Sequence, residues 1–277
     1  MVRRKANRYP FIFLIFIHIS MLMYTLYKSK DRKRIVTLLL SNIGMAYLFE
    51  YVAFNILQSY TYKPNFLKIR ALDNTIGAIL SQAIFVPITA IFITTFKYSW
   101  KTKLFFSMYF FVIEKVFIFL GIFKTNWWRT LYTATLIPCY FYLSDLWDKH
   151  LQKGTPIVLL LSLFNSMVVI HSTILYSLAI FRKMRFGVGV NHSWREHFII
   201  APIYTIALAA ITTWSMHSKN IPIIINLCSH HILDWVLKKQ QVLRTKLTFS
   251  FEVLFHFFMI FVAKGLKDLI YSEQKNK

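Results

Sequence analysis

Glycine, cysteine and acidic residues are scarce in this sequence. Seven of the 277 residues are glycine, two are cysteine, and Asp and Glu together number 11. So few glycines argue against the glycine-rich loops that hold nucleotide phosphates. Cys139 and Cys228 both lie inside apolar runs, and two cysteines make neither a disulfide framework nor a thiolate zinc site. Charged residues are only 16% of the chain, against about 25% in soluble domains, which excludes most soluble folds.

The basic residues outnumber the acidic ones by 33 to 11, for a formal net charge of +22. Such an excess on a soluble face would indicate nucleic-acid binding. Here the Lys and Arg residues gather in short connectors between long apolar segments, where they meet anionic lipid headgroups. We therefore predict a lipid bilayer with anionic headgroups as the partner, together with other membrane proteins, and no nucleic acid.

Apolar segments near the length of a bilayer crossing, about 20 residues, repeat along the chain. They predict an all-α polytopic transmembrane helical bundle with about eight to nine spans, forming a single integral membrane domain over residues 1–277. The first segment lacks a small-x-small cleavage pattern and is predicted to be a retained span. The candidate spans are residues 10–27, 35–57, 75–96, 104–123, 131–147, 156–181, 198–214, 221–237 and 247–263.

The connectors are too short for an extramembrane domain. The longest, residues 58–74 and 182–197, have room for an interfacial helix at most, so any chemistry must occur in the spans or at their mouths. Residues 101–107 (KTKLFFS) and 244–250 (RTKLTFS) resemble each other at an offset of 143 residues. The halves do not align elsewhere at that offset, so chance is favoured over an internal duplication as the origin of this likeness.

Ionisable residues inside spans are the first candidates for function, because each costs about 2.5–3.5 kcal/mol at the bilayer centre. Glu50 lies in the second span, and Glu114 and Lys115 lie at the middle of the fourth. Adjacent helical residues point about 100° apart, so Glu114 and Lys115 do not face each other. Glu50, in another span, is therefore the natural partner of Lys115. Such a pair either lies on a solute or proton path or fixes the register of two helices.

The richest polar cluster is in the eighth span. Asn226, His230 and Asp234 are spaced by four and share one helix face, while His231 lies one turn from Asp234. This face favours a structural or pH-responsive role, with a proton or solute path, and acid/base chemistry or metal ligation, as the alternatives. Neither H-x-x-x-H nor H-x-x-E-H spacing occurs, so we predict no metal site and no cofactor.

Two further residues of the ninth span, Glu252 and His256, are also four apart. This spacing allows them to share a proton or to form a pair along the helix. They complete the set of intramembrane polar candidates.

One stretch resembles a known family. Val112-Ile113-Glu114 in a span, then Leu120-Gly121-Ile122, Asn126-Trp127-Trp128 and Leu131-Tyr132-Thr133, is similar to a pattern in small polytopic membrane proteins of spore-forming Gram-positive bacteria. That family has no assigned activity to carry over. The resemblance implies a bacterial cell (plasma) membrane, and a shared structural or functional role for Glu114 and the Trp127-Trp128 pair.

These observations favour a multi-pass membrane protein without an enzymatic centre. It would be either a small-solute or ion permease component or a scaffold in a membrane assembly, with Glu50, Glu114, Lys115, His230 and Asp234 lining any crevice. The alternative is a membrane-embedded enzyme that uses His230, His231 and Asp234. The enzyme hypothesis requires these three residues to converge with a polar residue of a neighbouring span.

Overall fold

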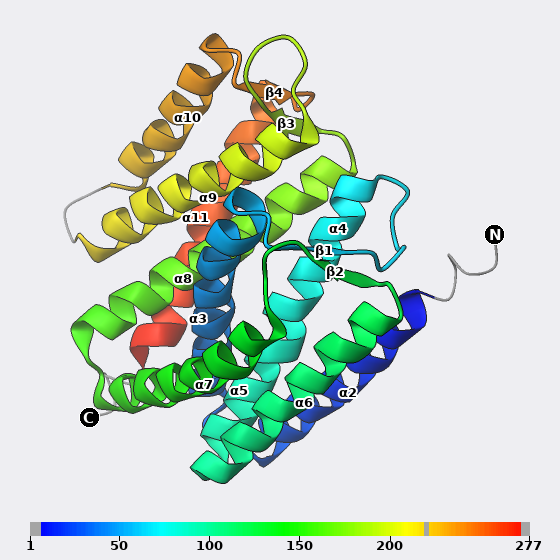
Figure 1. Cartoon of the computed structure of the whole chain (residues 1–277). Helices are drawn as coiled ribbons and strands as arrows, with labels where there is room; N and C mark the ends of the chain where they lie inside the picture. Colours follow the sequence, from blue (N-terminus) through cyan, green and yellow to red (C-terminus); the bar gives the residue numbers. More distant parts are fainter. Residues whose placement is uncertain (1–6, 219–221, 273–277) are drawn as a thin grey trace. The chain divides into compact units, whose positions relative to one another are not determined.

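The computed structural model describes residues 7–218 and 222–272. It divides into two compact units, Met1–Lys153 (the N-terminal unit) and Gly154–Lys277 (the C-terminal unit). The single integral membrane domain expected over residues 1–277 stays a prediction. Both units are almost entirely helical (Figure 1), which confirms the helical fold class.

The elements of the two units are as follows. The N-terminal unit contains α2 (Arg8–Lys28), α3 (Arg32–Glu50), η1 (Tyr51–Ile56), β1 (Tyr60–Tyr62), α4 (Arg70–Ile79), η2 (Leu80–Phe85), α5 (Val86–Thr95), α6 (Trp100–Phe119), β2 (Phe123–Thr125) and α7 (Thr130–Lys153). The C-terminal unit contains α8 (Pro156–Ile180), β3 (Met184–Phe186), α9 (Trp194–His217), α10 (Ile223–Lys239), β4 (Leu243–Thr245) and α11 (Phe249–Tyr271). The segments η1 and η2 are π-helical turns that continue α3 and join α4 to α5.

Within the described residues, each of the nine apolar segments coincides with a helix or a continuous run of helices; residue 221, the first of the eighth segment, lies outside the described residues. Six of the described helices are long and apolar enough to cross a membrane: Arg8–Lys28, Arg32–Ile56, Arg70–Thr95, Pro156–Ile180, Trp194–His217 and Phe249–Tyr271. The other three predicted spans correspond to α6, α7 and α10. The prediction of eight to nine spans is therefore not confirmed, whereas the coarser prediction of several membrane-spanning helices agrees with the structure.

Two short antiparallel strand pairs correct the view of the connectors. The connectors 58–74 and 182–197 contain β1 and β3, where we expected no more than an interfacial helix. In the N-terminal unit Tyr60 of β1 is opposite Thr125 of β2, and in the C-terminal unit Met184 of β3 is opposite Thr245 of β4. Each pair ties two helix ends that are far apart in the sequence.

The two units repeat one order of elements. In both, a long helix leads to a strand, two helical segments follow, and a second strand leads to a last helix: α3–β1–α4/α5–α6–β2–α7 in one and α8–β3–α9–α10–β4–α11 in the other (Figure 1). The first strands begin at Tyr60 and Met184, an offset of 124, and the second at Phe123 and Leu243, an offset of 120. The likeness at offset 143 joins α6 to the β4–α11 segment, which are not equivalent elements.

Backbone details support this repeat. The chain takes a positive φ before each strand, at Gln58 and Arg182 before β1 and β3, and at Gly121 and Gln241 before β2 and β4. The same bond also closes both strand pairs beyond their ends. It runs from Lys63 N to Ile122 O (2.8 Å) in one unit, and from Gly187 N to Val242 O (3.0 Å) in the other.

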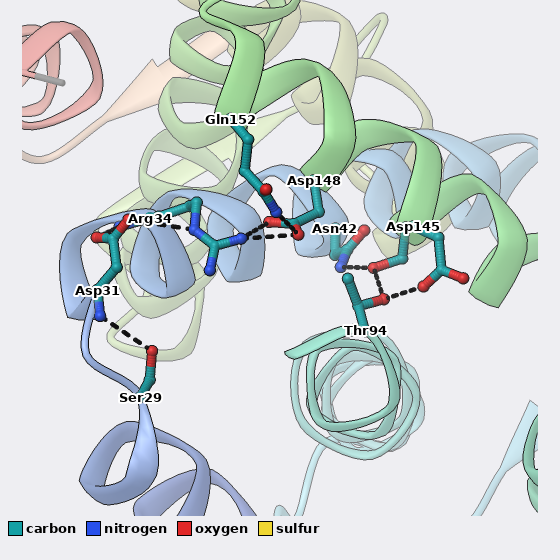
Figure 2. A network of polar contacts seen from close by, with 9 residues as sticks. Ser29, Asp31, Arg34, Asn42, Thr94, Asp145, Asp148 and Gln152 are labelled. Carbon is teal, nitrogen blue, oxygen red and sulfur yellow. Dashed lines mark hydrogen bonds and ion pairs between the residues drawn. The ribbon is translucent and has the colours of Figure 1, made fainter. Parts of the chain in front are cut away.

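A polar network ties α3, α5 and α7 of the N-terminal unit (Figure 2) and reaches α6 through Lys103. Arg34 of α3 donates from Nη1 to both carboxylate oxygens of Asp148 in α7, at 2.6 and 2.7 Å, and from Nε to Asp31 at 3.1 Å. Gln152 donates to Asp148 at 2.6 Å. Because the Asp148 side chain is only 8% exposed, this ion pair is largely withdrawn from water.

The same network continues on the next turn of α7. The Ser144 hydroxyl accepts from Asn42 of α3 at 2.8 Å and from Thr94 of α5 at 3.1 Å. Lys103 of α6 forms an ion pair with Asp145, which also accepts from Thr94 at 2.6 Å. The polar face of α7 therefore fixes how α3, α5 and α6 are arranged around it.

Candidate functional site

The N-terminal unit encloses a cavity of about 350 Å³. Ten of its 22 lining residues are aromatic, and Glu114 is the one carboxyl group among them. Small-molecule sites are typically apolar cavities of about 300–1,000 Å³ with a few fixed polar groups. The cavity therefore has the size and lining of a binding site for a small molecule.

Glu114 lies at the end of a hydrogen-bond chain in the cavity wall. The indole Nε1 of Trp128 donates to Oγ1 of Thr133 at 2.9 Å, and the Thr133 hydroxyl donates to Oε2 of Glu114. The Glu114 side chain is buried, and its Oε1 atom has no hydrogen-bond partner among the described residues. One carboxylate oxygen is thus held in place while the other is free to accept from a ligand.

Glu50, the last residue of α3, positions two lining residues. Its Oε2 atom accepts from the Tyr60 hydroxyl at 2.6 Å and from Nε2 of Gln82 at 3.0 Å. Burial raises the pKa of Tyr60 well above its usual value, and the nearby charge of Glu50 raises that pKa further. The phenol therefore stays protonated and keeps donating to Glu50.

The expected pair between Glu50 and Lys115 does not form. Glu50 binds Tyr60 and Gln82 instead. The exposed Lys115 places its ammonium 5.7 Å from the centre of the Phe111 ring and does not line the cavity. The expectation was wrong because adjacent residues of a helix face different ways, and here Glu114, not Lys115, faces inward.

The connector after β2 holds the end of η1. Nδ2 of Asn126 donates to the Gln58 carbonyl at 2.5 Å, and Nε1 of Trp127 donates to the Leu57 carbonyl at 2.8 Å. These carbonyls directly precede β1, which carries Tyr60. The Asn126-Trp127-Trp128 run thus fixes the backbone beside β1 with its first two residues and supports Glu114 with its third.

A second polar cluster lies in the C-terminal unit. Asn226, His230 and Asp234 are all buried on one face of α10. Asp234 accepts from the Tyr204 hydroxyl of α9 at 2.6 Å on Oδ1, and its Oδ2 lies 2.8 Å from Nε2 of His256 in α11. Three helices therefore converge on one carboxylate.

Two more histidines lie beside the pair formed by Asp234 and His256. The rings of His230 and His231 lie 5.0 and 5.1 Å from the ring of His256, measured between centroids. His230 also shares a 3.0 Å hydrogen bond with Thr212, and its ring lies 6.2 Å from that of His171 in α8. The convergence required by the enzyme hypothesis is therefore present.

Glu252 and His256 do not form the pair that their spacing allows. Glu252 is bound to Lys238 of α10 at 2.5 Å, and His256 is bound to Asp234. Both side chains are buried, so each takes an opposite or complementary partner from α10 in preference to its neighbour on α11.

The two sites occupy corresponding places in the repeat. Glu114 precedes the start of β2 by the same number of residues as Asp234 precedes β4, since the offset is 120 for both. The surroundings differ, with aromatic rings around Glu114 and histidines around Asp234.

Sequence reasoning missed three residues that contact or surround these carboxylates. Thr133 and Tyr204 give no signal of their own, because single hydroxyls are common in membrane helices and serve packing. His171 does give one: it is an ionisable residue within an apolar segment, and the cost argument that selected Glu114 applies to it as well.

The chain is thus a helical protein of two similar units, and six of its described helices are long and apolar enough to cross a membrane. Comparison with protein families, with curated proteins and with solved structures finds no match for the chain. The function is therefore argued from the residues of the two sites.

Proposed function

We propose that this protein is a multi-pass protein of a bacterial cell membrane that binds a small solute in the cavity of the N-terminal unit, as a permease component. The solute has an apolar body and a cationic head. The observation that carries the proposal is the free Oε1 atom of Glu114, buried in the wall of an aromatic cavity.

The lining favours a cation over a neutral or anionic solute. Aromatic faces attract an ammonium through their quadrupoles, by about 2 kcal/mol or more when water is excluded. A carboxylate held by Thr133 adds a directed acceptor for the head group. A basic side chain that would neutralise Glu114 inside the cavity is absent from the lining, since Lys115 lies outside it.

The proposal is tested by binding of benzylammonium, whose N–H groups can donate to Glu114, to the full-length protein in lipid nanodiscs, measured by titration calorimetry. Its neutral isostere, ethylbenzene, fills a similar volume without the charge. We expect the Glu114→Gln variant to bind the cation about 10- to 100-fold more weakly, since a bond to a charged group is worth about 1.5–3 kcal/mol. Gln keeps the size of Glu and can still accept from Thr133.

Lys115→Ala is the matched control, because it changes the charge of the adjacent residue outside the cavity. It should leave the affinity within about twofold. Equal affinities of the Glu114→Gln and Lys115→Ala variants, or tighter binding of the neutral isostere, would contradict the proposal. A scaffold role in a membrane assembly is the conclusion if the wild-type protein binds neither probe.

A membrane-embedded enzyme is a second candidate. The observation that favours it is the contact of Asp234 with both Tyr204 and His256, next to His230 and His231. A carboxylate that orients an imidazole is a common arrangement for acid/base catalysis. This candidate concerns the C-terminal unit alone and requires a reactive group there.

A further inference from the structure

We propose that His231, Asp234 and His256 form a binding site for a divalent transition-metal ion, with Zn²⁺ as the ion that their chemistry fits best. One ligand atom from each residue lies within 4.8 Å of the other two. Two imidazoles and one carboxylate make a three-ligand set that leaves a coordination position open, as in catalytic zinc sites. The site lies in the C-terminal unit and is independent of the solute cavity.

The contacts of the three residues show how they are held together without an ion. Nε2 of His256 and Oδ2 of Asp234 lie 2.8 Å apart and share a proton. An ion with bonds of about 2.0–2.1 Å to both atoms would separate them to about 3.3 Å in a tetrahedral site. These two atoms would therefore separate by roughly 0.5 Å, and the ligand atom of His231, which lies within 4.8 Å of the other two, would move closer by up to about 1.5 Å.

An unpaired nitrogen atom is the second observation. Nε2 of His231 is buried and has no hydrogen-bond partner in the described part of the chain. The His231 ring lies 5.1 Å from the ring of His256, which is bound to Asp234. Buried polar atoms almost always have a partner, so an unpaired nitrogen beside this pair indicates a missing ligand.

The surroundings supply the outer contacts that metal ligands need. Tyr204 donates to Oδ1 of Asp234 at 2.6 Å, which orients the carboxylate and leaves Oδ2 directed at His256. Outer-sphere bonds of this kind hold metal ligands in position. The nearest ammonium, that of Lys238, is neutralised by Glu252 at 2.5 Å, and His230 is held by Thr212.

The donor set also selects among ions. Imidazole nitrogen suits Zn²⁺ and its neighbours in the first transition row. Ca²⁺ and Mg²⁺ take six or more oxygen ligands, and the three residues offer one carboxylate. We therefore expect no binding of Mg²⁺ or Ca²⁺ at concentrations that saturate the site with Zn²⁺.

The test uses full-length protein without an affinity tag, in nanodiscs, stripped of metal with a chelator. We expect one equivalent of Zn²⁺ to bind, measured by elemental analysis after dialysis, and Co²⁺ to produce the visible absorption of a low-symmetry site. His231→Ala should weaken Zn²⁺ binding by more than the about 10–100-fold that a lost outer-sphere contact costs. Zn²⁺ should also raise the melting temperature of the wild-type protein by mass action, and should not raise that of His231→Ala.

His217→Ala is the matched control, since it removes an exposed histidine of the same unit and should leave Zn²⁺ affinity unchanged. His231 is only partly buried, so the metal-free His231→Ala protein should melt near the wild type. Asp234→Asn is the second variant and should also lose the ion. The proposal is overturned if the stripped wild-type protein binds no equivalent of Zn²⁺, or if His231→Ala binds it as tightly as His217→Ala does.

Discussion

Replacing Gly77 by alanine is expected to destabilise the N-terminal unit strongly. Gly77 of α4 packs directly on β1, and a Cβ atom added there would lie 2.4 Å from Cβ and 2.7 Å from Cγ of Tyr62. Tyr62 cannot move aside easily, because its backbone N–H donates to Oδ1 of Asn74 at 2.7 Å and the residue pairs with Phe123 of β2.

The size of the effect follows from two opposing contributions. Overpacking a tight interior costs about 1–3 kcal/mol and occasionally more, and contacts near the backbone place Gly77→Ala at the upper end. Alanine in place of glycine within a helix stabilises the folded state by about 1 kcal/mol. The net loss of about 2 kcal/mol or more is measured as a lower unfolding midpoint and a reduced monodisperse fraction in detergent.

Gly265→Ala is the matched control. Gly265 lies in α11, and a Cβ atom there would meet nothing within 4 Å. Only the helix-propensity gain of up to about 1 kcal/mol remains, so this variant should melt at or above the wild-type temperature. A Gly77→Ala protein that melts with the wild type would show that β1 can yield to α4.

The second large effect is expected from breaking the Arg34–Asp148 pair (Figure 2). Arg34→Met leaves Asp148 largely buried with Gln152 as a partner. Removing one member of a buried ion pair costs about 3–5 kcal/mol, because the other charge stays uncompensated. We expect a loss of this size in the free energy of unfolding, measured in mixed micelles.

A double-mutant cycle separates the energy of the interaction between Arg34 and Asp148 from the packing of each side chain. Arg34→Met combined with Asp148→Leu removes both charges and should recover most of the loss, since an apolar pair of similar volume often replaces a buried ion pair at little cost. Lys124→Met removes an exposed charge of β2 and should change stability by about 0.5 kcal/mol or less. Additive losses in the double variant would mean that the two side chains act separately.

Helices were predictable from this sequence, and the short strands were not. Apolar runs bounded by basic connectors locate each helical segment, because a helix that crosses the bilayer core needs about 20 consecutive apolar residues. A strand of three residues such as Tyr60–Tyr62 has too few positions for a pattern. Its partner strand, Phe123–Thr125, lies far along the chain, so only the folded structure shows the pairing.

The candidate site was predictable in part. Burial cost singled out Glu50, Glu114 and Asp234, and all three are buried with hydrogen-bond partners. Their partners were not predictable, because the burial-cost argument selects ionisable residues and the Tyr204 hydroxyl is uncharged. The number of spans is not confirmed, because length and composition single out six helices and leave out α10, which has 17 residues.

The repeated order of elements was not predicted from the sequence either. Its offset changes from 124 residues at the first strands to 120 at the second. Comparing the two halves at one fixed offset therefore does not find it. Side chains at corresponding places have diverged as well, for example Tyr62 and Phe186 at the ends of the first strands. Backbone turns and hydrogen bonds, which depend little on side-chain identity, preserve the likeness.

The repeat also places a carboxylate at the same distance before the second strand of each unit. The side chains around it differ, because Glu114 lies among aromatic rings and Asp234 among histidines. One backbone frame therefore presents an acid in two different surroundings within the same polypeptide.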